Sequence, residues 1–145
     1  MKITKATDEA LPVVVALACR LWPDSEAESL YSELAGIITQ PEAAFFLAWE
    51  DGEAVGFAQC QLRRDYVEGT DSSPVGYLEG IYVAPAYRQQ HIASALLQTC
   101  QQWAKAQGCA EFASDCELTN EESFRFHLNA GFQEANRIIC FVKKI

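Results

Sequence analysis

The sequence predicts a mixed α/β fold, with a central mixed sheet flanked by helices in the order β-α-α-β-β-β-α-β-α-β. Three observations predict it. The 145 residues are 50% hydrophobic and 21% charged, as expected for a single globular domain over residues 1–145. Short β-rich runs alternate with stretches whose apolar residues recur at helical spacing. No internal repeat, linker or low-complexity segment breaks this order.

The first part of the chain is expected to form one strand and two helices. Residues 1–6 alternate enough for a short opening strand. Residues 7–9, Thr-Asp-Glu, mark a helix start with Pro12 in the first turn, and Pro23 ends that helix. Residues 25–28, Ser-Glu-Ala-Glu, form a capping box that opens the second helix.

A hairpin and a long loop are expected next. The β-rich runs at 44–49 and 54–62 flank the Asp-Gly pair at 51–52, which is a strong hairpin turn signal. Residues 65–76 are the long loop candidate, and loops of this length in compact domains are often functional. Residues 77–83 are then expected to form a buried strand.

The rest of the chain adds two helices and two strands. A helix begins at Ile92 and is stopped by Gly108. Residues 111–116 form the next expected strand, and a capping box at 119–122 starts a short helix that runs to the next glycine. Residues 137–142 have no cap and no helical period, so they are expected to close the chain as a strand.

Charge and cysteine usage exclude several classes of function. The net charge is −9, and all of the imbalance lies in residues 1–80, which hold 5 basic and 14 acidic side chains. Nucleic acid is therefore an improbable partner, whereas a cationic ligand would be attracted to this part. No apolar run reaches the roughly 20 residues of a membrane span, and no export signal is present, so a cytoplasmic protein without a membrane partner is expected. The six cysteines show no metal or redox spacing and are expected to be reduced and mostly buried.

The connection between the strand at 77–83 and the helix beginning at Ile92 predicts a pyrophosphate site. Backbone N–H groups and the positive end of the helix dipole would meet there. The spacing Arg88-x-x-His91-x-Ala93 resembles the R/Q-x-x-G-x-G/A acyl-CoA motif of the GNAT superfamily of N-acetyltransferases. The chain departs from that motif at His91, which replaces the first glycine. This matters if the position needs a positive φ, which His adopts less readily than Gly.

Further motifs resemble the aminoglycoside 6'-N-acetyltransferases of that superfamily. They are Leu21-Trp22-Pro23, Arg64-Asp65-Tyr66-Val67, Asp71-Ser72-Ser73-Pro74-Val75, Leu78-Glu79-Gly80-Ile81, Tyr87-Arg88-Gln89, Ala113-Ser114-Asp115 and Gly131-Phe132. The resemblance implies the GNAT acyl-CoA N-acyltransferase fold and a homodimer. It also implies acetyl-CoA as cosubstrate, with direct transfer to the 6'-amino group of an aminoglycoside in a ternary complex, which confers antibiotic resistance.

The resemblance also implies two sets of binding residues. Acetyl-CoA would contact Ile81, Tyr82, Val83, Arg88, Gln89, Gln90, His91, Ile92, Ala93, Ser94 and Asn120. The aminoglycoside would contact Trp22, Tyr66, Asp71, Glu79, Asp115 and Asn136. Such an acceptor carries several ammonium groups, so carboxylates and a flat apolar surface suit it. No metal is expected.

Glu79 is the candidate general base, because the acceptor amine must lose a proton before it attacks a thioester. A carboxylate in a buried strand is costly without a task or a partner, so a salt-bridged structural glutamate is the alternative. His127 lies four residues before Gly131, where many GNAT enzymes place the tyrosine that protonates the departing thiolate. His127 could do that work, or it could only pack or bind the cofactor.

Two other functions stay open at this point. One is a GNAT enzyme that acts on polyamines, other small amines or protein N-termini through the same CoA site. The other is an acyl-CoA-binding module without activity, which the unusual His91 suggests.

Overall fold

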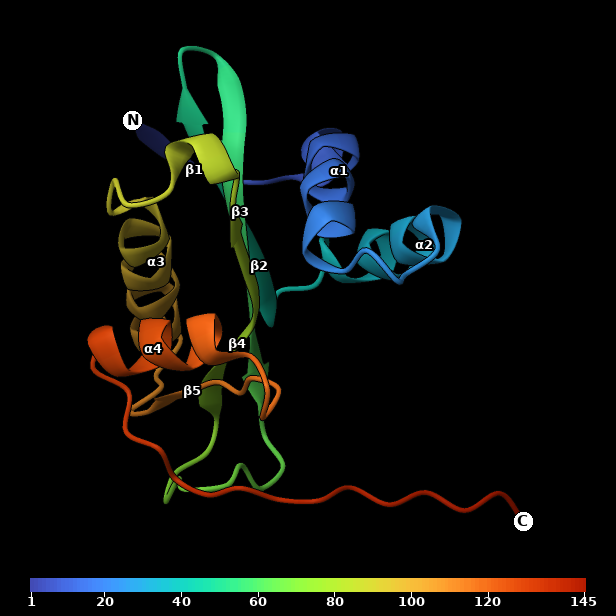
Figure 1. Cartoon of the computed structure of the whole chain (residues 1–145), viewed down its shortest axis with the longest axis vertical. Coiled ribbons are helices and arrows are strands. Elements are labelled where there is room, and N and C mark those ends of the chain that lie inside the picture. Colours follow the sequence, from blue (N-terminus) through green and yellow to red (C-terminus); the bar gives the residue numbers. More distant parts are fainter.

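The computed structural model describes residues 1–145 and shows a five-stranded sheet with a helical layer on each face (Figure 1). The strands are β1 (Lys2–Lys5), β2 (Ala43–Glu50), β3 (Glu53–Arg63), β4 (Val75–Val83) and β5 (Phe112–Ala113). They lie in the order β1-β2-β3-β4-β5. The first four are antiparallel neighbours, and β5 pairs parallel with β4. The mixed sheet predicted from the sequence is confirmed.

Two apolar cores lie on the two faces of the sheet. One face is covered by α1 (Leu11–Leu21) and α2 (Ala27–Ile37), and the other by α3 (Ile92–Ala106), with α4 (Glu121–Asn129) on the same side (Figure 1). Side chains of β2 alternate between them, since Phe45 packs toward α1 and α2 while Phe46 packs toward α3. Because β2 is covered on both faces, its sequence is almost continuously apolar.

Local turn and cap signals are only partly confirmed. Asp51 and Gly52 have φ values of 49° and 81° between the paired residues Glu50 and Glu53, which is the two-residue turn that Asp-Gly predicts. The predicted capping boxes are wrong. The N-cap of α2 is Glu26, with no side-chain cap bond. The N-cap of α4 is Asn120, whose Oδ1 accepts from the Ser123 amide at 3.1 Å.

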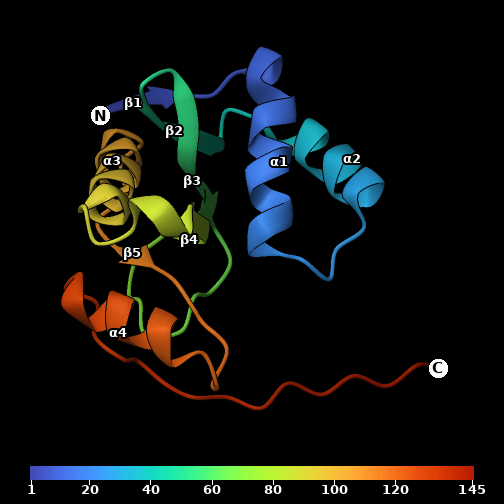
Figure 2. The same ribbon diagram turned by 45° about the horizontal axis from the view of Figure 1, so that its top comes forward.

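The last predicted strand is wrong, and the one before it is shorter than expected. Residues 137–142 have no strand partner, and only Phe112 and Ala113 of the run 111–116 pair with β4. Asn136 donates to Glu68 at 3.2 Å, and beyond this anchor the chain runs away from the sheet (Figure 2). Strand propensity cannot produce a strand where no neighbouring backbone is within reach.

The structure also contains two short 3₁₀ turns, and it shows the state of the six cysteines. A short 3₁₀ turn, Asp8–Ala10, precedes α1, and a second one, Pro85–Tyr87, follows β4. No helix combines the length and the apolar character that a membrane crossing requires. All six cysteines are unpaired, with Cys60 and Cys100 buried. Cys140 is exposed, contrary to the expectation from its apolar surroundings in the sequence, because the final strand is absent.

Candidate active site

The sheet opens between β4 and β5. The two strands pair only through Gly76 with Phe112 and Tyr77 with Ala113, while β4 continues to Val83. On the other side of β4 the register shifts by one residue, so that Gln59 pairs with Gly80 and Cys60 with Leu78. Glu79 is therefore the extra residue of a β-bulge, a feature that re-aims side chains beside active sites. The β5 side of residues 78–83 has no paired strand, which leaves that edge open to a ligand.

The loop after β4 has the backbone shape of an anion site. Gln89 and His91 have φ values of 62° and 63°, so His91 adopts the left-handed conformation that the glycine motif requires. His tolerates this conformation better than most residues, which explains the departure from the motif. The start of α3 has no side-chain cap and no acidic residue in its first turn. Its free N–H groups and the helix dipole favour an anion at this position.

Arg88 holds this loop against the end of β4. Its Nε donates to the Val83 carbonyl oxygen at 2.9 Å, and its Nη1 lies 3.7 Å from a carboxylate oxygen of Glu122. Its guanidinium carbon lies 5.8 Å from the centre of the Tyr82 ring. Three of the predicted cofactor residues, Tyr82, Val83 and Arg88, are therefore in one contact network, and Ile92, Ala93 and Ser94 form the first turn of α3 next to it.

Glu79 has a cationic partner that sequence reasoning missed. Arg63, the last residue of β3, donates from Nε and Nη2 to Glu79 Oε1 at 3.0 and 2.9 Å, and from Nη2 to Oε2 at 2.8 Å. The guanidinium carbon lies 3.4 Å from the centre of the Tyr77 ring, and the Tyr77 hydroxyl donates to Asp115 Oδ2. Burial and the bond to Asp115 raise the pKa of Tyr77. The two carboxylates predicted to bind the acceptor, Glu79 and Asp115, are thus brought into one network that joins β3, β4 and the segment after β5.

The signal for Arg63 was present in the sequence. A half-buried carboxylate needs a cation, and Arg63 immediately precedes the motif at 64–67. Its pairing with Glu79 depends on strand register, which the motif itself does not contain.

Trp22 lies against Gly80, the residue that follows Glu79. It caps the C-terminal end of α1 and meets Phe57 edge to face, with ring centres 6.2 Å apart. A Cβ on Gly80 would be only 2.7 Å from the Trp22 ring, so the glycine permits the close approach of ring and strand. This half-buried aromatic surface, packed on the residue after Glu79, suits an aminosugar ring.

The loop between β3 and β4 holds two further predicted residues outside this network, Tyr66 and Asp71, and Asn136 of the C-terminal segment contacts the same loop. Tyr66 is 78% exposed. The Asp71 amide donates to Glu111 Oε1 at 2.9 Å, and Ser72 donates to the same oxygen at 2.5 Å, which together hold the pKa of Glu111 below its ordinary value. Asn136 contacts this loop through its bond to Glu68. The structure gives no direct contact from Tyr66, Asp71 or Asn136 to Glu79.

Both ring nitrogens of His127 are engaged. Nδ1 lies 2.6 Å from the Ser123 carbonyl oxygen, and Nε2 lies 2.8 Å from Ser114 Oγ. A carbonyl oxygen only accepts, so Nδ1 donates to Ser123, and Nε2 faces the Ser114 hydroxyl. The ring also packs against Phe132, with centres 5.1 Å apart. His127 thereby joins α4 to Ser114, the residue that precedes Asp115.

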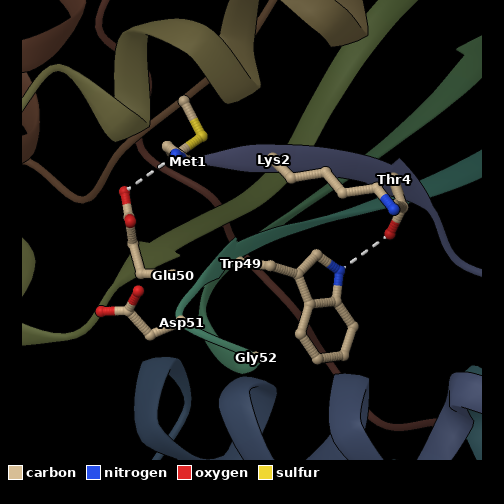
Figure 3. A pocket seen from close by; sticks show the side chains of 7 residues that line it. All are labelled: Met1, Lys2, Thr4, Trp49, Glu50, Asp51 and Gly52. Carbon is tan, nitrogen blue, oxygen red and sulfur yellow. Dashed lines mark hydrogen bonds and ion pairs between the residues drawn. The ribbon is translucent and has the colours of Figure 1, made fainter.

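A separate cavity of about 550 Å³ lies beside β1 and the β2–β3 hairpin (Figure 3). The Met1 ammonium lies 3.5 Å from Glu50 Oε1 there, and Trp49 Nε1 donates to Thr4 at 2.9 Å. None of the predicted site residues lines it.

Comparison with known proteins agrees with this geometry. The model of the acetyltransferase (GNAT) family matches residues 11–132. An aminoglycoside N(6')-acetyltransferase type 1 from Acinetobacter haemolyticus is 41% identical over 145 residues, which are 100% of this chain and 99% of that protein. The protein of the same description from Salmonella typhimurium is 40% identical over 125 residues, 86% of each chain.

Solved structures agree equally well. AAC(6')-Iy in complex with the bisubstrate analogue CoA-S-monomethyl-acetylneamine is 37% identical, with a TM-score of 0.95 over 99% of this chain and 98% of that one. The aminoglycoside antibiotic 6'-N-acetyltransferase AAC(6')-Ih from Acinetobacter baumannii is 41% identical, with a TM-score of 0.92 over the same shares. The chain therefore belongs to the acetyltransferase (GNAT) family, in its group of aminoglycoside N(6')-acetyltransferases.

Proposed function

We propose that the protein transfers the acetyl group of acetyl-CoA to the 6'-amino group of aminoglycoside antibiotics and so confers resistance to them. The observation that carries the proposal is the network that joins Glu79 to Asp115 through Arg63 and Tyr77, with the Trp22 ring packed on the neighbouring Gly80. The full-length similarity to proteins described as aminoglycoside N(6')-acetyltransferases supports the same acceptor.

Acetyl-CoA would lie along β4 and end at the loop before α3. The loop at 88–91 and the first turn of α3 offer N–H groups to the pyrophosphate. The open edge of β4 offers N–H groups near Tyr82 and Val83 to the thioester carbonyl, where negative charge develops during attack. Asn120 would contact the pantetheine chain through its side-chain amide, since its Oδ1 already caps α4.

The acceptor would lie across Trp22 with its ammonium groups toward the carboxylates. Tyr66, Asp71 and Asn136 would contact its outer rings from the loop between β3 and β4 and from the C-terminal segment. The excess of acidic side chains in residues 1–80 favours the approach of a polycation to this side.

In the reaction, the amine nitrogen attacks the thioester carbonyl carbon, the C–S bond breaks, and CoA leaves as the thiolate. The proton that the nitrogen loses passes to Glu79, directly or through a water molecule, and the thiolate finally takes up a proton to give the thiol. His127 would have to leave Ser114 to reach the sulfur. We therefore propose that His127 positions α4 against Ser114 and that the thiolate leaves without its help.

The test is product analysis after incubation of acetyl-CoA with kanamycin or tobramycin, with the acetyl group located by NMR. Acetylation at the 6' nitrogen, absent with an aminoglycoside that carries a hydroxyl at this position, is the expected result. Glu79→Gln should lower turnover about 10²-fold at low pH and less at high pH, where free amine is available without a base. Acetylation confined to polyamines or peptides, or CoA binding without turnover, would contradict the proposal.

We also propose that the enzyme is a homodimer joined by its C-terminal segments. Residues 138–142 are a continuous apolar run, Ile-Ile-Cys-Phe-Val, yet Phe141 and Val142 are 91% and 95% exposed in the single chain. Such a run is typical of a strand covered on both faces. The fit to AAC(6')-Iy extends over 99% of the chain, so the extended segment is part of the similarity. A second copy would cover this segment and accept it as a strand.

Sedimentation of the full chain and of two truncated chains tests the dimer. The full chain and a chain ending at Val142 should be dimers. A chain ending at Arg137 should be a monomer. A monomeric full chain at micromolar concentration would contradict the proposal.

The proposed compartment is the cytoplasm, where six unpaired thiols persist.

A further inference from the structure

The Arg63–Glu79 pair leaves little free hydrogen-bonding capacity on the carboxylate. A carboxylate has about four acceptor positions. Arg63 occupies two on Oε1 and one on Oε2, so the remaining position on Oε2 is the one that an acceptor amine or a bridging water can use. The pair is close to neutral as a unit, which means that Glu79 offers a hydrogen-bond acceptor rather than a bare negative charge.

We propose that Arg63 is a positioning residue that fixes the Glu79 carboxylate and keeps the bound acceptor amine unprotonated. This inference rests on the proposed acetyl transfer to an amine. It assigns to Arg63 a role that the binding and catalytic residues above do not include.

The electrostatic reason is the short distance between the Arg63 guanidinium and the nitrogen atom of the bound amine. Arg63 Nη2 lies 2.8 Å from Glu79 Oε2. An amine at hydrogen-bond distance from the same oxygen would lie about 4–5 Å from the guanidinium. A like charge within about 4–6 Å disfavours the charged form of an amine by one to three pKa units. The Arg63 side chain is 41% exposed, so screening by solvent reduces the effect to about one unit.

This effect matters because only the free amine can attack. An alkylammonium of the lysine type has a pKa of about 10.4, so at pH 7 fewer than about one molecule in a thousand is the free amine. A bare carboxylate would bind the ammonium form and hold it there. Pairing of the carboxylate with Arg63 removes that preference and raises the free fraction about ten-fold for each pKa unit.

Apart from Arg63 and Asp115, the groups around Glu79 are uncharged. From β4, the Tyr77 hydroxyl donates to Asp115 and stays neutral, because burial and Asp115 raise its pKa. From β3, the contact with Cys100 and then burial raise the pKa of the Cys60 thiol and keep it neutral. From α1 come only uncharged groups, the Leu21 side chain and the Trp22 ring, which pack on Gly80. Asp115 is the remaining charge, and Tyr77 stands between it and Arg63.

The experiment compares Arg63→Gln, Arg63→Lys and the wild type by steady-state kinetics with one aminoglycoside between about pH 6 and pH 9. Arg64→Gln is the matched control, since Arg64 pairs with the exposed Glu42 at 2.5 Å and takes no part in the network. Arg63→Gln should lower kcat about ten-fold at pH 6, and the loss should become smaller as the pH rises toward the pKa of the amine. The aminoglycoside KM at pH 6 should stay level or fall, because the ammonium form binds more tightly. Arg63→Lys, which keeps the charge, should restore the wild-type pH profile to within about two-fold.

A merely structural role for Arg63 predicts a different pattern, namely a raised KM or a kcat loss that is equal at all pH values. Either result, or an Arg63→Lys variant that behaves like Arg63→Gln, would overturn the proposal. If Arg63→Gln does not fold, NMR titration of a ¹⁵N-labelled 6'-amine bound to wild-type enzyme with CoA decides. The pKa of the bound amine should be no higher than that of the free antibiotic, and a clearly higher value would overturn the proposal. If the proposed function itself is wrong, the result differs from all of these outcomes, because the wild type would then acetylate no aminoglycoside.

Discussion

The contact between Gly80 and the Trp22 ring can be tested with a single methyl group, by Gly80→Ala. Gly80 does not have a positive φ, so alanine fits its backbone and any effect comes from packing. The added Cβ would lie 2.7 and 2.8 Å from two carbons of the Trp22 ring and 3.0 Å from Cδ2 of Leu21. Ordinary contacts between carbon atoms begin at about 3.5 Å. The ring cannot give way easily, because its other side meets Phe57.

The expected loss of stability follows from this overlap. Overpacking of a well-packed site costs about 1–3 kcal/mol, and a rigid ring places Gly80→Ala near the middle of that range, at about 2 kcal/mol. For a chain of this size, each kcal/mol shifts Tm by about 2–4 °C, so Tm should fall by about 4–8 °C. Displacement of Trp22 should also raise the aminoglycoside KM more than the acetyl-CoA KM, since the ring is the proposed platform for the sugar.

Thermal and urea unfolding of four variants checks the reasoning: Gly80→Ala, Gly36→Ala, Trp22→Ala and the double variant Trp22→Ala/Gly80→Ala. Gly36→Ala is the matched control: no atom lies within 4 Å of its added Cβ, and in the interior of α2 it should raise stability by about 0.5–1 kcal/mol. The double variant Trp22→Ala/Gly80→Ala should be more stable than the sum of the single effects, because the ring that clashes is gone. A Gly80→Ala loss below about 0.5 kcal/mol, or additive effects in the double variant, would refute the steric argument.

Three further predictions concern the acceptor, the phosphate loop and the β3–β4 loop. Asp115→Asn should raise the aminoglycoside KM far more than the acetyl-CoA KM in steady-state assays. High salt should also raise the aminoglycoside KM of the wild type, though less, because it screens the charges. A loss of CoA binding alone would place Asp115 on the donor side. His91→Gly should keep the CoA dissociation constant, measured by calorimetry, within about two-fold of the wild-type value. It should raise the free energy of unfolding by up to about 1 kcal/mol, because glycine adopts a φ of 63° without strain. A large loss of CoA affinity would show that the imidazole contacts phosphate. Glu111→Gln should lower Tm at pH 7, since the Ser72 hydroxyl and the Asp71 amide hold the pKa of Glu111 below 4.5 and this stabilisation is present above that value. The difference in Tm should narrow as the pH falls below 4.5 and through the folded-state pKa, and a difference that does not narrow would contradict the prediction.

Several features of the fold followed from the sequence because they are encoded locally. The Asp-Gly turn at 51–52, the helices that begin at Leu11 and Ile92, and the strand at 77–83 all depend on residues within a few positions of one another. The family was also predictable, because its motifs are short segments with fixed spacing. Even the unusual His91 was correctly linked to a positive φ, since the motif specifies the backbone shape at that position.

The errors fall where a feature depends on what lies next to it in space. The run 137–142 has the composition of a strand, but whether it pairs depends on a neighbouring edge, and in the single chain none is in reach. The Ser25 and Thr119 capping boxes failed because the helices begin one residue later than those patterns place them. Boundary and pairing decisions of this kind are made by tertiary contacts.

For the site, the sequence by itself determined which residues have the chemistry: two carboxylates, an aromatic surface and a glycine-like turn before a helix. Only the tertiary structure decided how these groups meet. The register shift opposite Gln59 and Cys60 makes Glu79 a bulge residue, and it brings Arg63 from the end of β3 onto its carboxylate. The physical reason is that strand register and side-chain pairing are set by packing across the whole sheet, so that a partner 16 residues away leaves no local pattern in the chain.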